Sequence, residues 1–153
     1  MKTSLQEHSA EARAVWDAFR SGQPVRPPVA LGTNTRFFVF NEDLNPEEAV
    51  SFERYSTDAQ VMLEFQLRSQ AWRAEHIAPY CDDPMGLPEA FSVLVDLQNH
   101  EEAAFFGAPV VFLPHQVPDT QPILAGDRKH ALFDAGQPHP LTGGWYAQAH
   151  RMY

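Results

Sequence analysis

The chain has 153 residues, of which 44% are hydrophobic and 12% aromatic, and these proportions are typical of one globular domain rather than a disordered segment. Eleven basic residues against twenty acidic ones give a net charge of −9. This charge lacks the basic surface of a nucleic-acid-binding protein and disfavours an anionic membrane, so we expect neither as a partner.

The cysteine content and the N-terminal segment predict a soluble, cytoplasmic protein. Cys81 is the single cysteine, so no internal disulfide can form, which suits a reducing compartment. The N-terminal segment is charged and amphipathic, unlike a signal peptide. The longest uncharged run, residues 103–114, is shorter than the roughly 20 residues that span a bilayer.

The first predicted helix covers residues 4–20. Four apolar side chains fall on one face at helical spacing: Ala12, Val15, Trp16 and Phe19. Gly22 follows as a stop signal. The proline-rich stretch "QPVRPP" then predicts a stiff connector.

Two further helices are predicted in the middle of the chain. Asn45 is a good helix start because Pro46 suits the first helical position and Glu48 completes a capping box. A longer helix is predicted from near Asp58 until shortly before Pro79, with Val61, Met62, Phe65 and Trp72 facing inward.

Three apolar runs predict strands: "VALG" (29–32), "FSVLVDL" (91–97) and "PVVFL" (109–113). Because these runs alternate with helical segments, they indicate βα units and a parallel sheet. Two or three strands are too few for a complete sheet of this kind. The final segment, residues 145–153, has helical character without a cap or stop signal, so the pattern predicts a truncated protein.

The best candidate site residues follow two of these runs, in "TNTR" and "PHQVPDT". Loops that leave the carboxyl ends of parallel strands line the ligand site in α/β proteins. Arg36 can bind a carboxylate, and His115 and Asp119 can bind polar groups or transfer protons. The structural alternative is that Arg36 pairs with a surface acid and that Asp119 caps a turn with Thr120.

No metal or phosphate site is predicted. His76 and Cys81 are separated by a segment containing Pro79, and no second pair lies nearby at zinc-site spacing. The glycines in "GTNTR" and "TGGW" lack the spacing of phosphate-binding loops.

Two long segments resemble the N-terminal region of the uroporphyrinogen decarboxylase superfamily: "WDAFRSGQPVRPPVALGTNTRFF" and "MGLPEAFSVLVDLQNHEEAAFFGAPVVFLPHQVPDTQPIL". The second is similar to a bacterial branch called uroporphyrinogen-decarboxylase-like proteins. The similarity runs from about Trp16 to the end and implies an α/β fold, a TIM-type (β/α) barrel. Because a complete barrel needs about 250 residues, residues 25–153 would be its first few strand–helix units. Residues 1–24 would form a preceding helix and connector.

The superfamily has two activities, and the resemblance implies one of them for the full-length protein. The first expectation is a uroporphyrinogen-decarboxylase-like enzyme, a carboxy-lyase that needs no cofactor in this chain and acts on a tetrapyrrole-type or related carboxylated substrate. The alternative is a corrinoid-dependent methyltransferase, whose zinc ligands would lie outside this chain. In both cases this chain alone is expected to be inactive.

The resemblance also implies roles for particular residues. The decarboxylases carry two arginines in the first-strand loop, and this chain keeps the second of them, Arg36, which would hold a substrate carboxylate. Asp119 or His115 would stabilise the ring nitrogens or supply a proton. In the methyltransferase alternative, Asn34, Arg36 and the loop 115–119 would position the substrate.

A third alternative is a protein that is not an enzyme. A half-barrel with an open sheet edge would fold or act only with a partner. The expected partners are therefore a small-molecule substrate together with either a second copy of the chain or a corrinoid protein.

Overall fold

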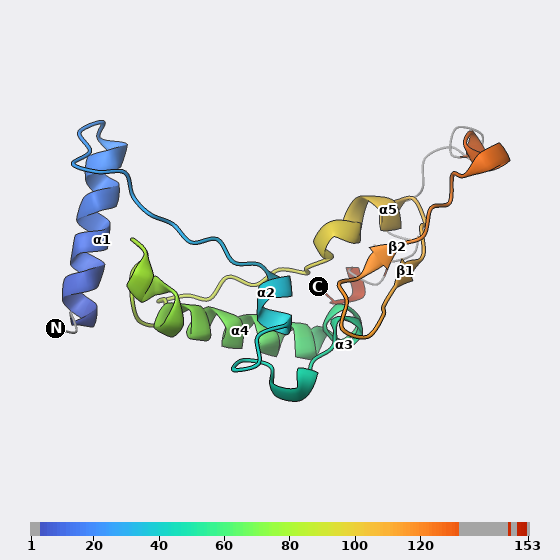
Figure 1. Ribbon diagram of the computed structural model, residues 1–153, viewed down its shortest axis with the longest axis horizontal. Coiled ribbons are helices and arrows are strands. Elements are labelled where there is room, and N and C mark those ends of the chain that lie inside the picture. Colours follow the sequence, from blue (N-terminus) through green and yellow to red (C-terminus); the bar gives the residue numbers. More distant parts are fainter. Residues whose placement is uncertain (1–3, 132–146, 148–149, 153) are drawn as a thin grey trace. The chain divides into compact units, whose positions relative to one another are not determined.

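The structure, a computed structural model, describes residues 4–131, 147 and 150–152 (Figure 1). The helices of this part are α1 (Leu5–Arg20), α2 (Thr35–Val39), α3 (Phe52–Thr57), α4 (Ala59–His76) and α5 (Glu101–Phe105), with 3-10 turns at Pro46–Glu48, Ala78–Tyr80, Gln98–His100 and Gly126–Arg128. The strands are β1 (Val110–Val111) and β2 (Asp119–Thr120). Most of the predicted C-terminal helical segment, residues 145–153, lies outside the described residues.

The chain divides into two compact units. The first unit comprises Met1–Phe38 and Glu64–Val93, and the second comprises Val39–Leu63 and Leu94–Tyr153. Helix α4 begins within the residues of the second unit and continues into those of the first.

The predicted partial TIM barrel is wrong. In the described part, the strands form one two-stranded sheet, in which β1 and β2 pair antiparallel with Val110 opposite Thr120 and Val111 opposite Asp119. A (β/α) barrel needs parallel strands that alternate with helices. The segment 112–118 instead returns the chain directly to the neighbouring strand, so Asp119 lies in β2 and not in a loop before a helix.

The predicted strand at 29–32 does not form because other groups occupy its backbone. The Val29 N–H donates to an Asp82 carboxylate oxygen at 2.7 Å, and the Val29 carbonyl accepts from the Asp82 N–H at 2.7 Å. The Leu31 carbonyl accepts a hydrogen bond from Arg73 at 2.8 Å. These contacts satisfy the donors and acceptors that a neighbouring strand would otherwise satisfy.

The predicted strand at 91–97 is replaced in a similar way. The Gln70 side chain accepts from the Ser92 N–H at 3.3 Å and donates to the Ser92 carbonyl at 2.8 Å. A side-chain amide carries both a donor and an acceptor, so it can pair with both backbone groups of an extended residue. Within the part of the chain that the structure describes, residues 91–97 contain no strand.

Helix α1 agrees with the prediction for residues 4–20. Ser4 begins it with a capping box: the Ser4 hydroxyl accepts from the Glu7 N–H at 3.2 Å, and the Glu7 carboxylate accepts from the Ser4 N–H at 3.0 Å. On the predicted apolar face, Ala12 and Val15 are buried and Trp16 is half-buried, whereas Phe19 is 47% exposed. Gly22 follows the helix in the left-handed region, with φ of 75°, which a glycine adopts without steric cost.

Helix α4 also agrees with the sequence prediction. Of the four side chains expected to face inward, Met62 and Phe65 are 3% and 2% exposed, whereas Val61 and Trp72 are half-buried. The helix has 18 residues, and neither proline nor glycine interrupts it.

The predicted capping box at Asn45 is wrong. The Asn45 side chain is buried and donates to the carbonyls of Val39 and Val50, at 2.8 and 2.9 Å, while it accepts from the Val50 N–H at 2.9 Å. Only the 3-10 turn Pro46–Glu48 follows, with Glu47 at a φ of 54°. Asn45 therefore closes a loop and does not start an α-helix.

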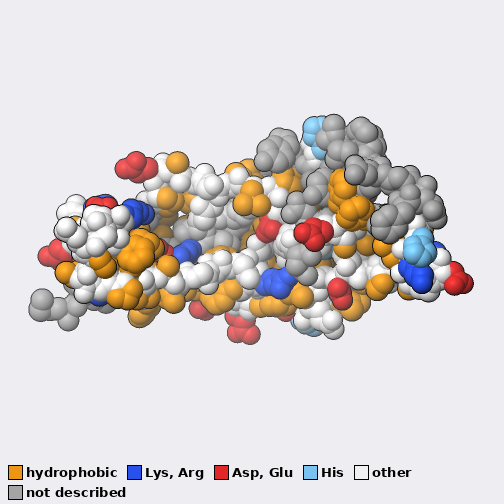
Figure 2. All heavy atoms as spheres, turned by 90° about the horizontal axis from the view of Figure 1, so that it is seen from above, with side chains coloured by type: hydrophobic (Ala, Val, Ile, Leu, Met, Phe, Trp, Pro, Cys, Tyr) orange, Lys and Arg blue, Asp and Glu red, His pale blue; other side chains and the backbone are white. Residues whose placement is uncertain are grey.

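Many apolar side chains remain at the surface of the described part, as the space-filling view illustrates (Figure 2). Val25, Tyr80 and Leu87 are 88%, 77% and 70% exposed. Among the described residues, no helix has both the length and the apolar composition needed to cross a bilayer.

Candidate functional site

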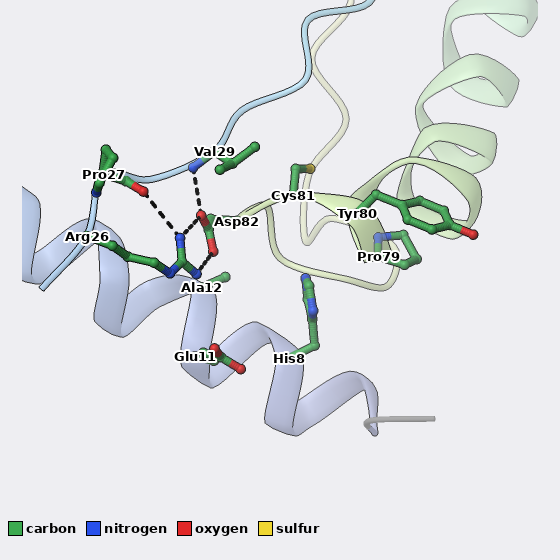
Figure 3. A pocket seen from close by; sticks show the side chains of 10 residues that line it. All are labelled: His8, Glu11, Ala12, Arg26, Pro27, Val29, Pro79, Tyr80, Cys81 and Asp82. Carbon is green, nitrogen blue, oxygen red and sulfur yellow. Dashed lines mark hydrogen bonds and ion pairs between the residues drawn. The ribbon is translucent and has the colours of Figure 1, made fainter. Parts of the chain in front are cut away.

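The first unit contains a hollow of about 560 Å³ around an ion pair (Figure 3). Three segments line it: the first half of α1, the connector after it, and the chain that follows α4. The lining residues are His8, Glu11, Ala12, Arg26, Pro27, Val29, Pro79, Tyr80, Cys81 and Asp82.

Arg26 and Asp82 form the ion pair of this hollow. Two guanidinium nitrogens of Arg26 donate to the two carboxylate oxygens of Asp82, both at 2.6 Å. The Asp82 backbone carbonyl also accepts from the Trp16 indole N–H at 2.8 Å, so the pair is anchored to α1. This bidentate geometry is the strongest form of contact between these two residue types.

The contacts keep both partners charged. The hydrogen bonds from Arg26 and from the Val29 N–H lower the pKa of Asp82 from 3.8 to about 2, and the hydrogen bond to Asp82 raises the pKa of Arg26. A carboxylate with this pKa stays ionised at neutral pH and is a poor general base. The ion pair therefore connects α1, the connector and the chain after α4, and it does not serve acid–base chemistry.

A second set of contacts surrounds Asp83. The Asp83 carboxylate accepts from Arg73 at 2.5 Å and from the Cys81 thiol at 3.4 Å, and its carbonyl lies 3.0 Å from the His8 ring. Burial raises the pKa of the Cys81 thiol. Because the thiolate is the nucleophilic form, Cys81 is not activated as a nucleophile.

The predicted substrate residues Asn34 and Arg36 belong to the first unit. The Asn34 side chain accepts from the Phe37 N–H at 3.1 Å, so Asn34 caps the start of α2. Arg36 is half-buried on α2, and no ion pair joins it to any residue that the structure describes.

An aromatic cluster accompanies Arg36 on α2. The Phe37 and Phe38 rings pack against the Trp72 ring of α4 with centroid distances of 6.0 and 6.2 Å. The Trp72 ring is stacked on His76 at 4.5 Å. Phe38 is buried, whereas Phe37 is 43% exposed and presents part of its ring to solvent.

The predicted catalytic residues His115 and Asp119 belong to the second unit. The exposed His115 ring lies 2.7 Å from the Glu48 carboxylate, and its φ of 56° is in the left-handed region. The exposed Asp119 carboxylate accepts from the Thr120 N–H at 2.8 Å, within β2 and not in the turn that the structural alternative predicted. His115 therefore contacts Glu48, whereas Asp119 contacts Thr120.

A buried polar cluster in the second unit was missed by the sequence analysis. Tyr55 is fully buried and its hydroxyl donates to Asp96 at 3.0 Å, while the Gln98 N–H donates to the other Asp96 oxygen at 2.9 Å. His100 is 1% exposed, and burial lowers its pKa against the opposing charge of Asp96. The only local signal was an aspartate within the apolar run "VLVDL".

Within the described residues, no group of three or more histidine, cysteine, aspartate or glutamate side chains is arranged to hold a metal ion.

Comparisons of the chain with protein-family models, with curated proteins and with solved structures gave no match.

Proposed function

We propose that the chain is part of a uroporphyrinogen-decarboxylase-like enzyme that acts on a carboxylated, tetrapyrrole-type substrate, and that Arg36 binds a substrate carboxylate. The proposal concerns binding chemistry and does not include the barrel, which the structure contradicts. It is supported by the sequence resemblance of residues 16–38 and 85–124 and by the surroundings of Arg36.

The state of Arg36 is the observation that carries the proposal. In the same unit, Arg26 and Arg73 are each bound to a carboxylate, of Asp82 and Asp83 respectively. Arg36 is also half-buried, but no residue of the described part forms an ion pair with it. A partly desolvated guanidinium is stabilised most by a carboxylate that accepts two parallel hydrogen bonds from it. A ligand can supply this carboxylate.

The neighbouring aromatic residues support a substrate that contains rings. Phe37 is the residue after Arg36 in α2. Its ring is partly exposed and also contacts the Trp72 ring. Aromatic side chains contribute a large apolar contact area at little conformational cost, and they stack against flat rings. A carboxylated pyrrolic compound combines the two features that this region can recognise.

The binding of uroporphyrin tests the proposal, because this stable compound carries the carboxylates and rings of the proposed substrate. We expect its fluorescence to change on titration with the chain, and the dissociation constant to rise roughly tenfold in Arg36→Gln. Arg20→Gln is the matched control, since Arg20 is exposed and pairs with Asp17 at 3.7 Å. Equal binding by Arg36→Gln and the control, or no binding by the unaltered chain, would refute the proposal.

A carboxyl count of the product extends the test to the reaction. Uroporphyrinogen is incubated with the full-length enzyme of which the chain is proposed to be part, and the products are separated by their number of carboxyl groups. Loss of carboxyl groups that depends on Arg36 is the expected result, and unchanged substrate together with absent uroporphyrin binding contradicts it.

A further inference from the structure

The first unit holds a second hollow, of about 590 Å³, that takes no part in the proposed function. Helix α1, the end of α4 and the loop 83–89 line it. Its size lies within the range of roughly 300–1,000 Å³ found for small-molecule sites. All of its lining residues belong to this one unit.

Two arginines face this hollow in different states. Arg73 uses its Nη2 atom to donate to the Leu31 carbonyl and the Asp83 carboxylate. Arg13, on α1, is exposed, and no described residue forms an ion pair with it. The hollow therefore offers one cation that is already neutralised and one that is free to bind a ligand.

The rest of the lining is mainly apolar. Ala74 and Ala78 of the chain around the end of α4 contribute small side chains, and Met85 and Leu87 contribute larger ones from the loop. Leu87 is 70% exposed and adds apolar surface to the wall of the hollow. An apolar wall beside one free guanidinium suits an amphiphilic anion.

We infer that this hollow binds a small organic monocarboxylate, with the carboxylate on Arg13 and the apolar body against Leu87, Met85 and Ala74. The acidic residues that face the hollow are Asp83 and Glu89. The charge of Asp83 is compensated by Arg73, whereas Glu89 opposes an anionic ligand. The two charges on the rim, Arg13 and Glu89, therefore act on the ligand in opposite directions.

Titration with hexanoate, followed by NMR of the full chain, tests this inference. We expect saturable shifts of the Ala74 and Ala78 signals, with a dissociation constant on the order of a millimolar. Arg13→Gln should weaken binding by roughly fivefold, and Glu89→Gln should strengthen it by roughly twofold. Hexan-1-ol and hexylammonium should bind much more weakly, and benzoate distinguishes an aromatic body from an aliphatic one.

The control is Arg20→Gln, which removes the same charge from α1 outside the lining of the hollow. Equal affinity of Arg13→Gln and Arg20→Gln, or absence of saturable shifts in the unaltered chain, would overturn the inference. Because the variants and the probe differ from those used for Arg36, this result is independent of the proposed function.

Discussion

Arg26 and Asp82 are 56 positions apart in the chain, yet they form the most completely matched ion pair of the described residues, with both carboxylate oxygens bound at 2.6 Å. Asp82 is only 6% exposed, whereas the Arg26 side chain is 43% exposed. Arg26 can therefore be replaced without a change in core packing, so a mutation of Arg26 tests the ion pair itself.

Replacement of Arg26 by glutamine should lower the stability of the chain. The Asp82 carboxylate would keep its hydrogen bond from the Val29 N–H but would lose both hydrogen bonds from the guanidinium. A buried carboxylate without its cation lowers the free energy of unfolding. We expect thermal unfolding to shift down by roughly 5 °C or more. Circular dichroism measures the shift, and Arg20→Gln, at an exposed pair, should change it little.

The contribution of Asp82 should depend on pH in acid. Its folded-state pKa of about 2 lies below the ordinary value of 3.8, so the folded chain binds this proton more weakly than the unfolded chain. The stabilisation is therefore complete above pH 4 and is lost as the pH falls toward 2. Urea midpoints of the unaltered chain and Asp82→Asn should differ at pH 7 and converge below pH 4. A constant difference over this range would contradict the assignment.

Cys81 should react slowly in the folded chain. Burial raises its thiol pKa, so the thiolate is scarce at pH 8 and is also shielded from solvent. We expect alkylation by iodoacetamide to be about tenfold slower, or more, than in the chain unfolded by urea. Mass spectrometry measures the rate at a single site, because Cys81 is the one cysteine. Similar rates in both states would show that the thiol is accessible.

Removal of the Tyr55 hydroxyl should destabilise the second unit. Tyr55→Phe leaves one oxygen of Asp96 without the donor at 3.0 Å, and the ring itself still fills the core. We expect a loss of about 1–1.5 kcal/mol in the free energy of unfolding. Tyr80→Phe is the control, since Tyr80 is 77% exposed. Equal effects of the two changes would argue against the buried hydrogen bond.

Two substitutions of Asn34 distinguish a capping role of this residue from a substrate-binding role. Asn34→Ala removes the acceptor of the Phe37 N–H and should cost about 1 kcal/mol, whereas Asn34→Asp keeps an acceptor and should retain stability. If Asn34 also bound a substrate carboxylate, Asn34→Asp would weaken uroporphyrin binding by charge repulsion. Urea unfolding and the uroporphyrin titration together therefore assign the residue to one role.

The long helices could be predicted from the sequence because their signals are local. The burial of Ala12 and Val15 follows from their spacing within α1. The strands could not be predicted reliably, because an apolar run does not specify what its backbone will bond to. Asp82 bonds to Val29 over 53 positions, and Gln70 bonds to Ser92 over 22.

The candidate site was also predictable only where its signals are local in the sequence. The sequence identified Arg36 as a potential carboxylate ligand, and the structure leaves it without an ionic partner in the described part. The Tyr55–Asp96 contact joins residues 41 positions apart, and no local motif indicates it. Side chains that pair across such distances become visible only when the tertiary structure is known.

The bond between Arg26 and Asp82 has a consequence for how the chain is made. The first unit is discontinuous, since its two segments, Met1–Phe38 and Glu64–Val93, are separated by a stretch of the second. During synthesis, α1 and the connector leave the ribosome long before Asp82 does. Until the later segment emerges, Arg26 has no Asp82 to bind. The apolar side chains of Ala12 and Val15 are then exposed, and chaperones can bind them.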